Sequence, residues 1–147
     1  MKVVDKVIQV PCSNSSDSDF FIRWVKFLRP IHNLTSQEQE VFATILRNRH
    51  KLSLGITDTS ILDEVCLNLA NRNAIKEELN ISSQQLNYIF KRLRDTKVLI
   101  PMYKRNGRID YYKVHPNYIP ALDKDTKLFK MLLVFKLDVE QEDSKTD

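Results

Sequence analysis

Two helical patterns followed by two strand patterns occupy residues 72–119, and this order constrains the fold more than any other feature of the chain. The predicted helices span 72–79 and 83–95, and the predicted strands span 98–103 and 108–114. The residues between the two helices are too few for anything but a tight turn. The segment is therefore predicted to be a helix-turn-helix followed by a hairpin, a layout best known for placing its second helix in the major groove of DNA.

The predicted helix 83–95 has one apolar face and one polar face. Its apolar residues recur at positions i, i+3, i+4 and i+7 and should point into a core, namely Leu86, Ile89, Phe90 and Leu93. The residues left on the outer face, with the last of them at its edge, are Ser83, Gln84, Asn87, Tyr88, Lys91 and Arg94. Gln and Asn side chains bond adenine edges, and Lys or Arg bonds guanine or phosphate. An ordinary solvent-exposed helix face has a similar composition, so the composition of this face fits either contact with DNA or exposure to solvent alone.

Basic residues surround the predicted hairpin turn at Asn106-Gly107. Asn-Gly is a strong hairpin signal, because both central residues of a type I′ turn adopt positive φ. Lys104, Arg105 and Arg108 flank this turn. A basic hairpin tip suits contact with a phosphate backbone or entry into a minor groove, although exposed tips are often charged for solubility alone. Pro101 predicts an edge strand or a bulge.

The positive charge of the chain is concentrated in this same segment. Residues 72–115 contain ten lysines and arginines against four acidic residues, whereas the whole chain has a net charge of +4. Residues 1–71 are neutral in sum, and residues 116–147 carry a surplus of two negative charges. Cationic charge gathered on one element is typical of a protein with a polyanionic partner.

The first half of the chain predicts a strand at 2–11 and three helices. An aromatic-rich helix over 20–28 should end before Pro30. The helix that follows begins at a capping box, Thr35 with Glu38, and runs to about Arg49. Its apolar stripe is Val41, Phe42, Ile45 and Leu46. A further helix is predicted over 60–69, with inward-facing Ile61, Leu62, Val65, Cys66 and Leu69.

The turn region and the C-terminal part complete the prediction. Ala74, Ile75 and Leu79 should form the buried face of the helix 72–79, Ile81 should fill the corner between the helices, and Ser82 or Ser83 should cap the next helix. Residues 128–137 are almost continuously apolar and predict a strand that is buried on both faces and pairs with the N-terminal strand or with another subunit. Residues 140–147 form a polar, mostly acidic tail.

The predicted fold class is therefore α+β: a winged helix-turn-helix, which is a helical bundle with a β-hairpin wing, with extra N-terminal and C-terminal strands. We divide the chain into an N-terminal strand and aromatic helix extension (1–33), a winged-helix domain (34–120), and a C-terminal strand with an acidic tail (121–147). The length of 147 residues fits one domain with terminal additions.

Several function classes find no support in the sequence. The three histidines lie far apart, and the adjacent acidic pairs diverge around their helices, so we expect neither an enzyme nor a metal site. The two cysteines have no ligand or redox spacing. Two glycines cannot form a glycine-rich phosphate loop, and we expect no cofactor and no small-molecule substrate. No apolar run reaches the length of a membrane span, so we expect a cytoplasmic protein without a membrane partner.

From Leu34 to Ile119 the chain resembles the winged-helix plasmid and phage replication proteins of the RepL type. The resemblance is carried by Leu34-Thr-Ser-Gln-Glu-Gln-Glu-Val41, Ile75-Lys-Glu-Glu-Leu-Asn-Ile-Ser82, Leu86 to Leu93, and Tyr112-Lys-Val-His-Pro-Asn-Tyr-Ile119. It implies sequence-selective binding of double-stranded DNA by the helix over 83–95, in replication initiation or transcription regulation. The stretch 51–70 is longer than a minimal winged helix needs, and the terminal strands lie outside the pattern.

These additions support an alternative function as a structural assembly protein. In a phage virion or head–tail connector component, the winged helix would serve as a protein–protein adaptor. Unpaired terminal strands can pair between subunits, and the aromatic residues over 20–28 resemble interface anchors. The expected partner is then a homo-oligomer or a larger protein assembly, and the expected location is the virion.

Overall fold

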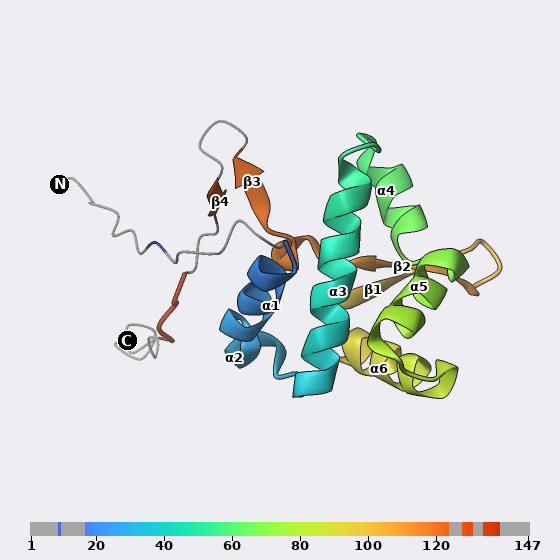
Figure 1. Cartoon of the computed structure of the whole chain (residues 1–147), viewed down its shortest axis with the longest axis horizontal. Coiled ribbons are helices and arrows are strands. Elements are labelled where there is room, and N and C mark those ends of the chain that lie inside the picture. Colours follow the sequence, from blue (N-terminus) through green and yellow to red (C-terminus); the bar gives the residue numbers. More distant parts are fainter. Residues whose placement is uncertain (1–8, 10–16, 124–127, 131–133, 139–147) are drawn as a thin grey trace, which may run out of the picture.

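The computed structural model describes residues 9, 17–123, 128–130 and 134–138 (Figure 1). Within these ranges the chain is an α+β protein with six α-helices and two antiparallel pairs of strands. The helices are α1 (Asp17–Phe27), α2 (Arg29–His32), α3 (Ser36–Ser53), α4 (Thr59–Cys66), α5 (Leu69–Leu79) and α6 (Ser83–Asp95). The strands are β1 (Leu99–Tyr103), β2 (Ile109–Val114), β3 (Ala121–Asp123) and β4 (Leu128–Lys130). This order is compatible with a winged helix-turn-helix layout.

Local hydrogen bonds at the helix starts explain where α3 and α6 begin. The Glu38 amide donates to the Thr35 hydroxyl at 3.3 Å, and the Thr35 amide donates to the Glu38 carboxylate at 3.0 Å. The same reciprocal pair joins Ser82 and Gln85 at the start of α6, at 3.1 and 2.9 Å. Such pairs satisfy amides that have no partner within the helix. Both predicted helix starts are confirmed, with Ser82 as the cap of α6.

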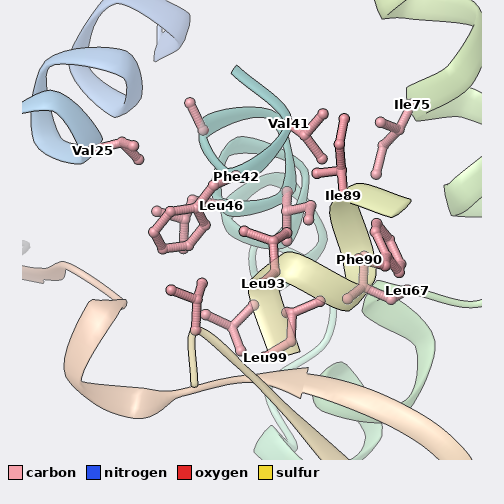
Figure 2. Close-up of a cluster of buried hydrophobic side chains, with 14 of the residues drawn as sticks. Val25, Val41, Phe42, Leu46, Leu67, Ile75, Ile89, Phe90, Leu93 and Leu99 are labelled. Carbon is pink, nitrogen blue, oxygen red and sulfur yellow. The ribbon is translucent and has the colours of Figure 1, made fainter. Parts of the chain in front are cut away.

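The hydrophobic core forms around α3, which packs against α1, α4, α5 and α6. Figure 2 shows Phe42 and Leu46 of α3 converging with Leu93 of α6 and Leu99 of β1. All four predicted apolar residues of α3 and all four of α6 are buried, which confirms both stripes. Ile81 is half-buried against this core, as expected for the corner between α5 and α6. The core therefore fixes the orientation of α6 and leaves its opposite face outward.

Residues 51–70 differ from the prediction. The helix α3 continues to Ser53, the helix predicted over 60–69 ends at Cys66 as α4, and the helix predicted over 72–79 begins earlier, at Leu69, as α5. The carboxamide oxygen of Asn68 accepts the Asn71 amide at 2.9 Å and starts α5. Because α5 is a separate helix, the spacing of core-facing positions along α4 does not continue into it. Leu67 is therefore buried and Leu69 is exposed. Ile61, predicted to face inward, is also exposed.

Burial along these helices departs from the prediction at two more positions. Val65 in α4 is only half-buried, and Ala74 in α5 is exposed. Ile75 alone of the three predicted α5 residues is fully buried, and Leu79 is half-buried against the core. The buried face of α5 is therefore narrower than the sequence predicts.

The hairpin β1–β2 is antiparallel, and its register runs from Leu99 opposite Val114 to Tyr103 opposite Ile109. Of the two turn residues expected to have positive φ, only Gly107 does, at 84°. The Lys104 amide donates to the Arg108 carbonyl at 2.7 Å, and the Gly107 amide donates to the Lys104 carbonyl at 3.0 Å. These bonds enclose a three-residue loop that ends in a left-handed glycine, which replaces the predicted two-residue turn.

The described residues of the C-terminal part also differ from the prediction. Within the strand expected over 128–137, the described residues 128–130 form β4, which pairs with β3, whereas residues 131–133 lie outside the described residues. Residues 134–138 have no regular secondary structure and are exposed, so burial on both faces is wrong for them. Phe129 of β4 stacks on Phe20 of α1, with ring centroids 4.1 Å apart. Apart from residue 9, the strand expected over 2–11 lies outside the described residues, as does the tail 140–147.

The first helical segments contain a buried histidine. The His32 Nε2–H donates to the Val25 carbonyl at 2.7 Å, and Nδ1 accepts the Leu34 amide at 3.0 Å. Only a neutral ring protonated on Nε2 satisfies both bonds, because a proton on Nδ1 would face the Leu34 donor. Burial lowers the pKa of His32 below its usual value, with the charge of Arg29 acting in the same direction and the Val25 bond against it.

Stability is expected to fall when the pH is lowered below the ordinary histidine pKa of about 6.5. Below this pH the unfolded chain binds a proton at His32 more readily than the folded chain does, so a lower pH favours unfolding. The contribution of neutral His32 to the free energy of unfolding is therefore fully present only above about pH 6.5. The slope per group is at most about 1.4 kcal/mol per pH unit. Urea unfolding at pH 7.5 and 5.5 measures it against His32→Gln as the control. An equal pH dependence in both proteins would contradict the assignment.

Candidate nucleic-acid interface

The outward face of α6 presents four exposed side chains in line. Gln84, Asn87, Tyr88 and Lys91 are all exposed, and their spacing places them on one side of the helix. Tyr88 keeps 63% of its surface accessible. Within the described residues, none of the four has an intramolecular hydrogen bond or ion pair from its side chain. This face is therefore available to a partner without first breaking internal bonds.

The two ends of the predicted face are less free. Ser83 is exposed, but its hydroxyl accepts a hydrogen bond from the Lys76 ammonium at 2.8 Å. Arg94 is half-buried at the edge of the helix, as its predicted edge position requires. Both residues border the open face without occupying its centre.

At the hairpin tip, the side chains of Lys104, Arg105 and Arg108 are exposed. The Lys104 ammonium lies 4.0 Å from the Asp110 carboxylate, in a pair so open to solvent that its energy is small. Within the described residues, Arg105 and Arg108 have no acidic partner. The tip thus retains net positive charge.

Two of the ten basic residues in 72–115 have side chains that are held by contacts within the protein. The Arg92 guanidinium contacts the buried Glu38 carboxylate at 3.3 Å, which ties α6 to the start of α3. Arg72 lies over the rings of Phe90 and Tyr112, at 5.5 and 5.9 Å, and its Nε–H donates to the Leu67 carbonyl at 2.8 Å. The net positive charge counted over 72–115 is therefore larger than the charge that a partner could contact.

Lys76 belongs to the candidate surface, although its position in the sequence did not predict this. Asn80 adopts a left-handed conformation with φ of 52° and ends α5, so the chain turns back and brings position 76 beside position 83. An open hollow at this turn is lined by Asn73, Lys76, Glu77, Asn80, Ile81, Ser82 and Ser83. The only sequence signal that Lys76 would lie close to Ser83 is an asparagine that follows an amphipathic helix.

The candidate site thus has two parts, the outward face of α6 and the hairpin tip. In Figure 1 the hairpin loop and the beginning of α6 both lie on the right-hand side of the molecule, away from α1, α2 and the C-terminal segment. Because β1 follows α6 after a short turn and packs against it, the core fixes the hairpin relative to the helix. The base of the hairpin is therefore anchored to α6 through β1.

Other groups with chemical potential lie elsewhere. Cys66 is buried, and burial raises the pKa of its thiol to about 12, so it is not a nucleophile at neutral pH. In the part of the chain that the structure describes, no three His, Cys, Asp or Glu side chains gather as metal ligands would. Among the same residues, no helix is long and apolar enough to cross a bilayer.

Comparison of the chain with family models, with curated proteins and with solved structures found no match.

Proposed function

We propose that this chain is a winged helix-turn-helix protein that binds double-stranded DNA. In this proposal α6 enters the major groove, and the wing over 104–108 contacts the phosphate backbone. The observation that carries it is the exposed polar face of α6, which the chain combines with a cationic hairpin tip. The resemblance to replication proteins of the RepL type supports a role in replication initiation or transcription regulation of a phage or plasmid.

The chemistry of the α6 face suits base edges. Gln84 and Asn87 carry carboxamides, which can both donate to and accept from adenine. Lys91 and Arg94 follow one and two turns later, where they can bond guanine or neutralise a phosphate. Tyr88 stands between these pairs and offers an aromatic ring to a thymine methyl group. One helical face thus offers contacts that suit adenine, guanine and thymine edges.

The chemistry of the wing suits the backbone. Arg105 and Arg108 present forked guanidinium groups that match phosphate oxygens, and Lys104 adds a point charge. Phosphate contacts set the position of a protein on the duplex without reading its sequence. The wing therefore supplies affinity, and α6 supplies selectivity.

A nuclear magnetic resonance titration tests this proposal. The full-length, ¹⁵N-labelled protein is titrated with a short random-sequence duplex, and amide shifts are followed. We expect the largest shifts at residues 83–94 and 104–108, with small shifts in α3 and α4 as the internal control. Affinity should fall by about 10³ between 50 and 200 mM salt if about six phosphates are contacted. Shifts centred on α1 and α2, or binding insensitive to salt, would contradict it.

The alternative function as an assembly component is supported by a different observation. Large apolar side chains are exposed far from α6 and the hairpin tip, among them Phe27 and Phe135. Single exposed apolar residues are normal, so this observation favours an assembly component only where such side chains form a contiguous patch. A particle of many subunits with no affinity for duplex DNA would favour this function.

A further inference from the structure

Tyr103, the last residue of β1, is an exposed aromatic residue where the hairpin loop begins. It keeps 63% of its surface accessible. Among the described residues, its side chain has no ring contact, no cation over its face and no hydrogen bond. Two other tyrosines pack inside the fold, where Tyr112 meets Phe90 edge-on at 6.3 Å and Tyr118 meets Phe42 edge-on at 5.6 Å. Packing therefore accounts for those two rings and leaves the ring of Tyr103 without a partner.

The hairpin places cations directly next to this residue. Tyr103 lies opposite Ile109 in the strand pairing, and the next pair along the hairpin is Lys104 with Arg108, whose backbones are joined by a 2.7 Å hydrogen bond. Neighbouring positions on a strand are only about 3.3 Å apart. Arg105 lies within the loop, and neither it nor Arg108 has an acidic partner among the described residues. An aromatic ring and two guanidinium groups therefore share one short loop, which projects from the body in Figure 1.

The face of a nucleic-acid base is the ligand that this combination of groups suits. Aromatic side chains stack on bases, and a cationic surface beside them follows the phosphate backbone of a single strand. In an intact duplex the faces of each base are covered by its neighbours, so a protein ring meets only base edges in the grooves. A ring gains a stacking partner where a base is unpaired and exposes its face, as at a strand end or in an opened segment.

We propose that Tyr103 stacks on an unpaired DNA base while Arg105 and Arg108 hold the adjoining phosphates, so that the hairpin tip binds the boundary between duplex and single strand. This inference rests on the proposed function, because α6 is what holds the protein on the adjoining duplex. The ring needs no rearrangement of the fold to reach a base, since its side chain is already open to solvent. One base stacked on an aromatic side chain makes binding about five- to 150-fold tighter.

Fluorescence anisotropy with the full chain and three labelled DNA probes tests the proposal. The first probe is a blunt duplex, the second is the same duplex with an extension of about six unpaired thymidines, and the third has an extension of equal length without bases. The second and third probes have equal charge, so the ratio of their dissociation constants measures contacts to the unpaired bases alone. We expect the wild type to bind the thymidine extension about five- to 150-fold more tightly than the abasic one.

Variants identify the ring as the cause of this preference. Tyr103→Ala should reduce the ratio to below about twofold, and Tyr103→Phe should keep it, because stacking needs the ring and not the hydroxyl. Tyr103→Leu supplies apolar volume without an aromatic face, so it should lose the ratio as the alanine variant does. Tyr88→Ala is the matched control, because Tyr88 has the same exposed fraction of 63% but lies on α6. Its removal should weaken binding of all three probes and leave the ratio unchanged.

The blunt duplex separates this inference from the proposed function. A ratio that Tyr103→Ala leaves intact, or that Tyr103→Leu keeps in full, would overturn stacking by Tyr103. Salt-dependent binding of the blunt duplex with a wild-type ratio of about one would overturn the inference and leave duplex binding in place. Binding of the thymidine extension without affinity for the blunt duplex would support stacking by Tyr103 and contradict the proposed function.

Discussion

Replacing Phe42 with alanine is expected to lower the free energy of unfolding by about 3–5 kcal/mol. Phe42 is completely buried in α3, with the rings of His32 and Tyr118 packed edge-on at 6.1 and 5.6 Å. The change removes a large apolar side chain and leaves a cavity that these neighbours only partly fill. Domains of this kind are stable by about 5–15 kcal/mol, so the loss is a large fraction of the total.

Urea unfolding followed by circular dichroism measures this loss. Leu54→Ala is the matched control, because it removes an apolar side chain that is mostly exposed, and its effect should stay within about 0.5 kcal/mol. A loss below about 1 kcal/mol for Phe42→Ala would mean that α3 is not the centre of the core.

The helices that carry their own start signals were predictable from the sequence. The helix α6 begins and ends where the capping serine and the apolar spacing place it, and α3 begins at its capping box. These signals are local, since each joins residues three or four positions apart. The predicted outward face of α6 follows from the same spacing, and the exposed side chains agree with it.

What the sequence could not predict depends on contacts between distant residues or on competing local signals. The Arg92–Glu38 contact joins residues 54 positions apart, and it removes a cation from the surface. The break between α4 and α5 lies earlier in the chain than the predicted break between 69 and 72, because apolar residues continue past Cys66 and only Asn68 marks the new helix. The loop at Gly107 has one more residue than an Asn-Gly turn requires, because the strands pair with a bulge at Met102 and Tyr103.

The central claim is that α6 and the hairpin tip together bind duplex DNA, and removing their cations tests it most directly. Lys91, Arg94, Arg105 and Arg108 are replaced with alanine, first as two pairs and then together. Each lost phosphate contact should cost about eightfold in affinity at 0.1 M salt, so four should cost about 10³–10⁴. The salt slope should fall by about 0.9 for each contact. The structural reason is that all four side chains reach solvent without acidic partners among the described residues.

Fluorescence anisotropy with a labelled duplex at several salt concentrations gives both quantities. Lys51→Ala is the control: this exposed cation at the end of α3 lies far from the contact of α3 with α6, and its removal should change affinity less than about twofold. Circular dichroism should show that every variant stays folded. The account predicts a loss of about a thousandfold or more with a flattened salt dependence in the four-residue variant. An affinity and a salt slope equal to those of the wild type would contradict it.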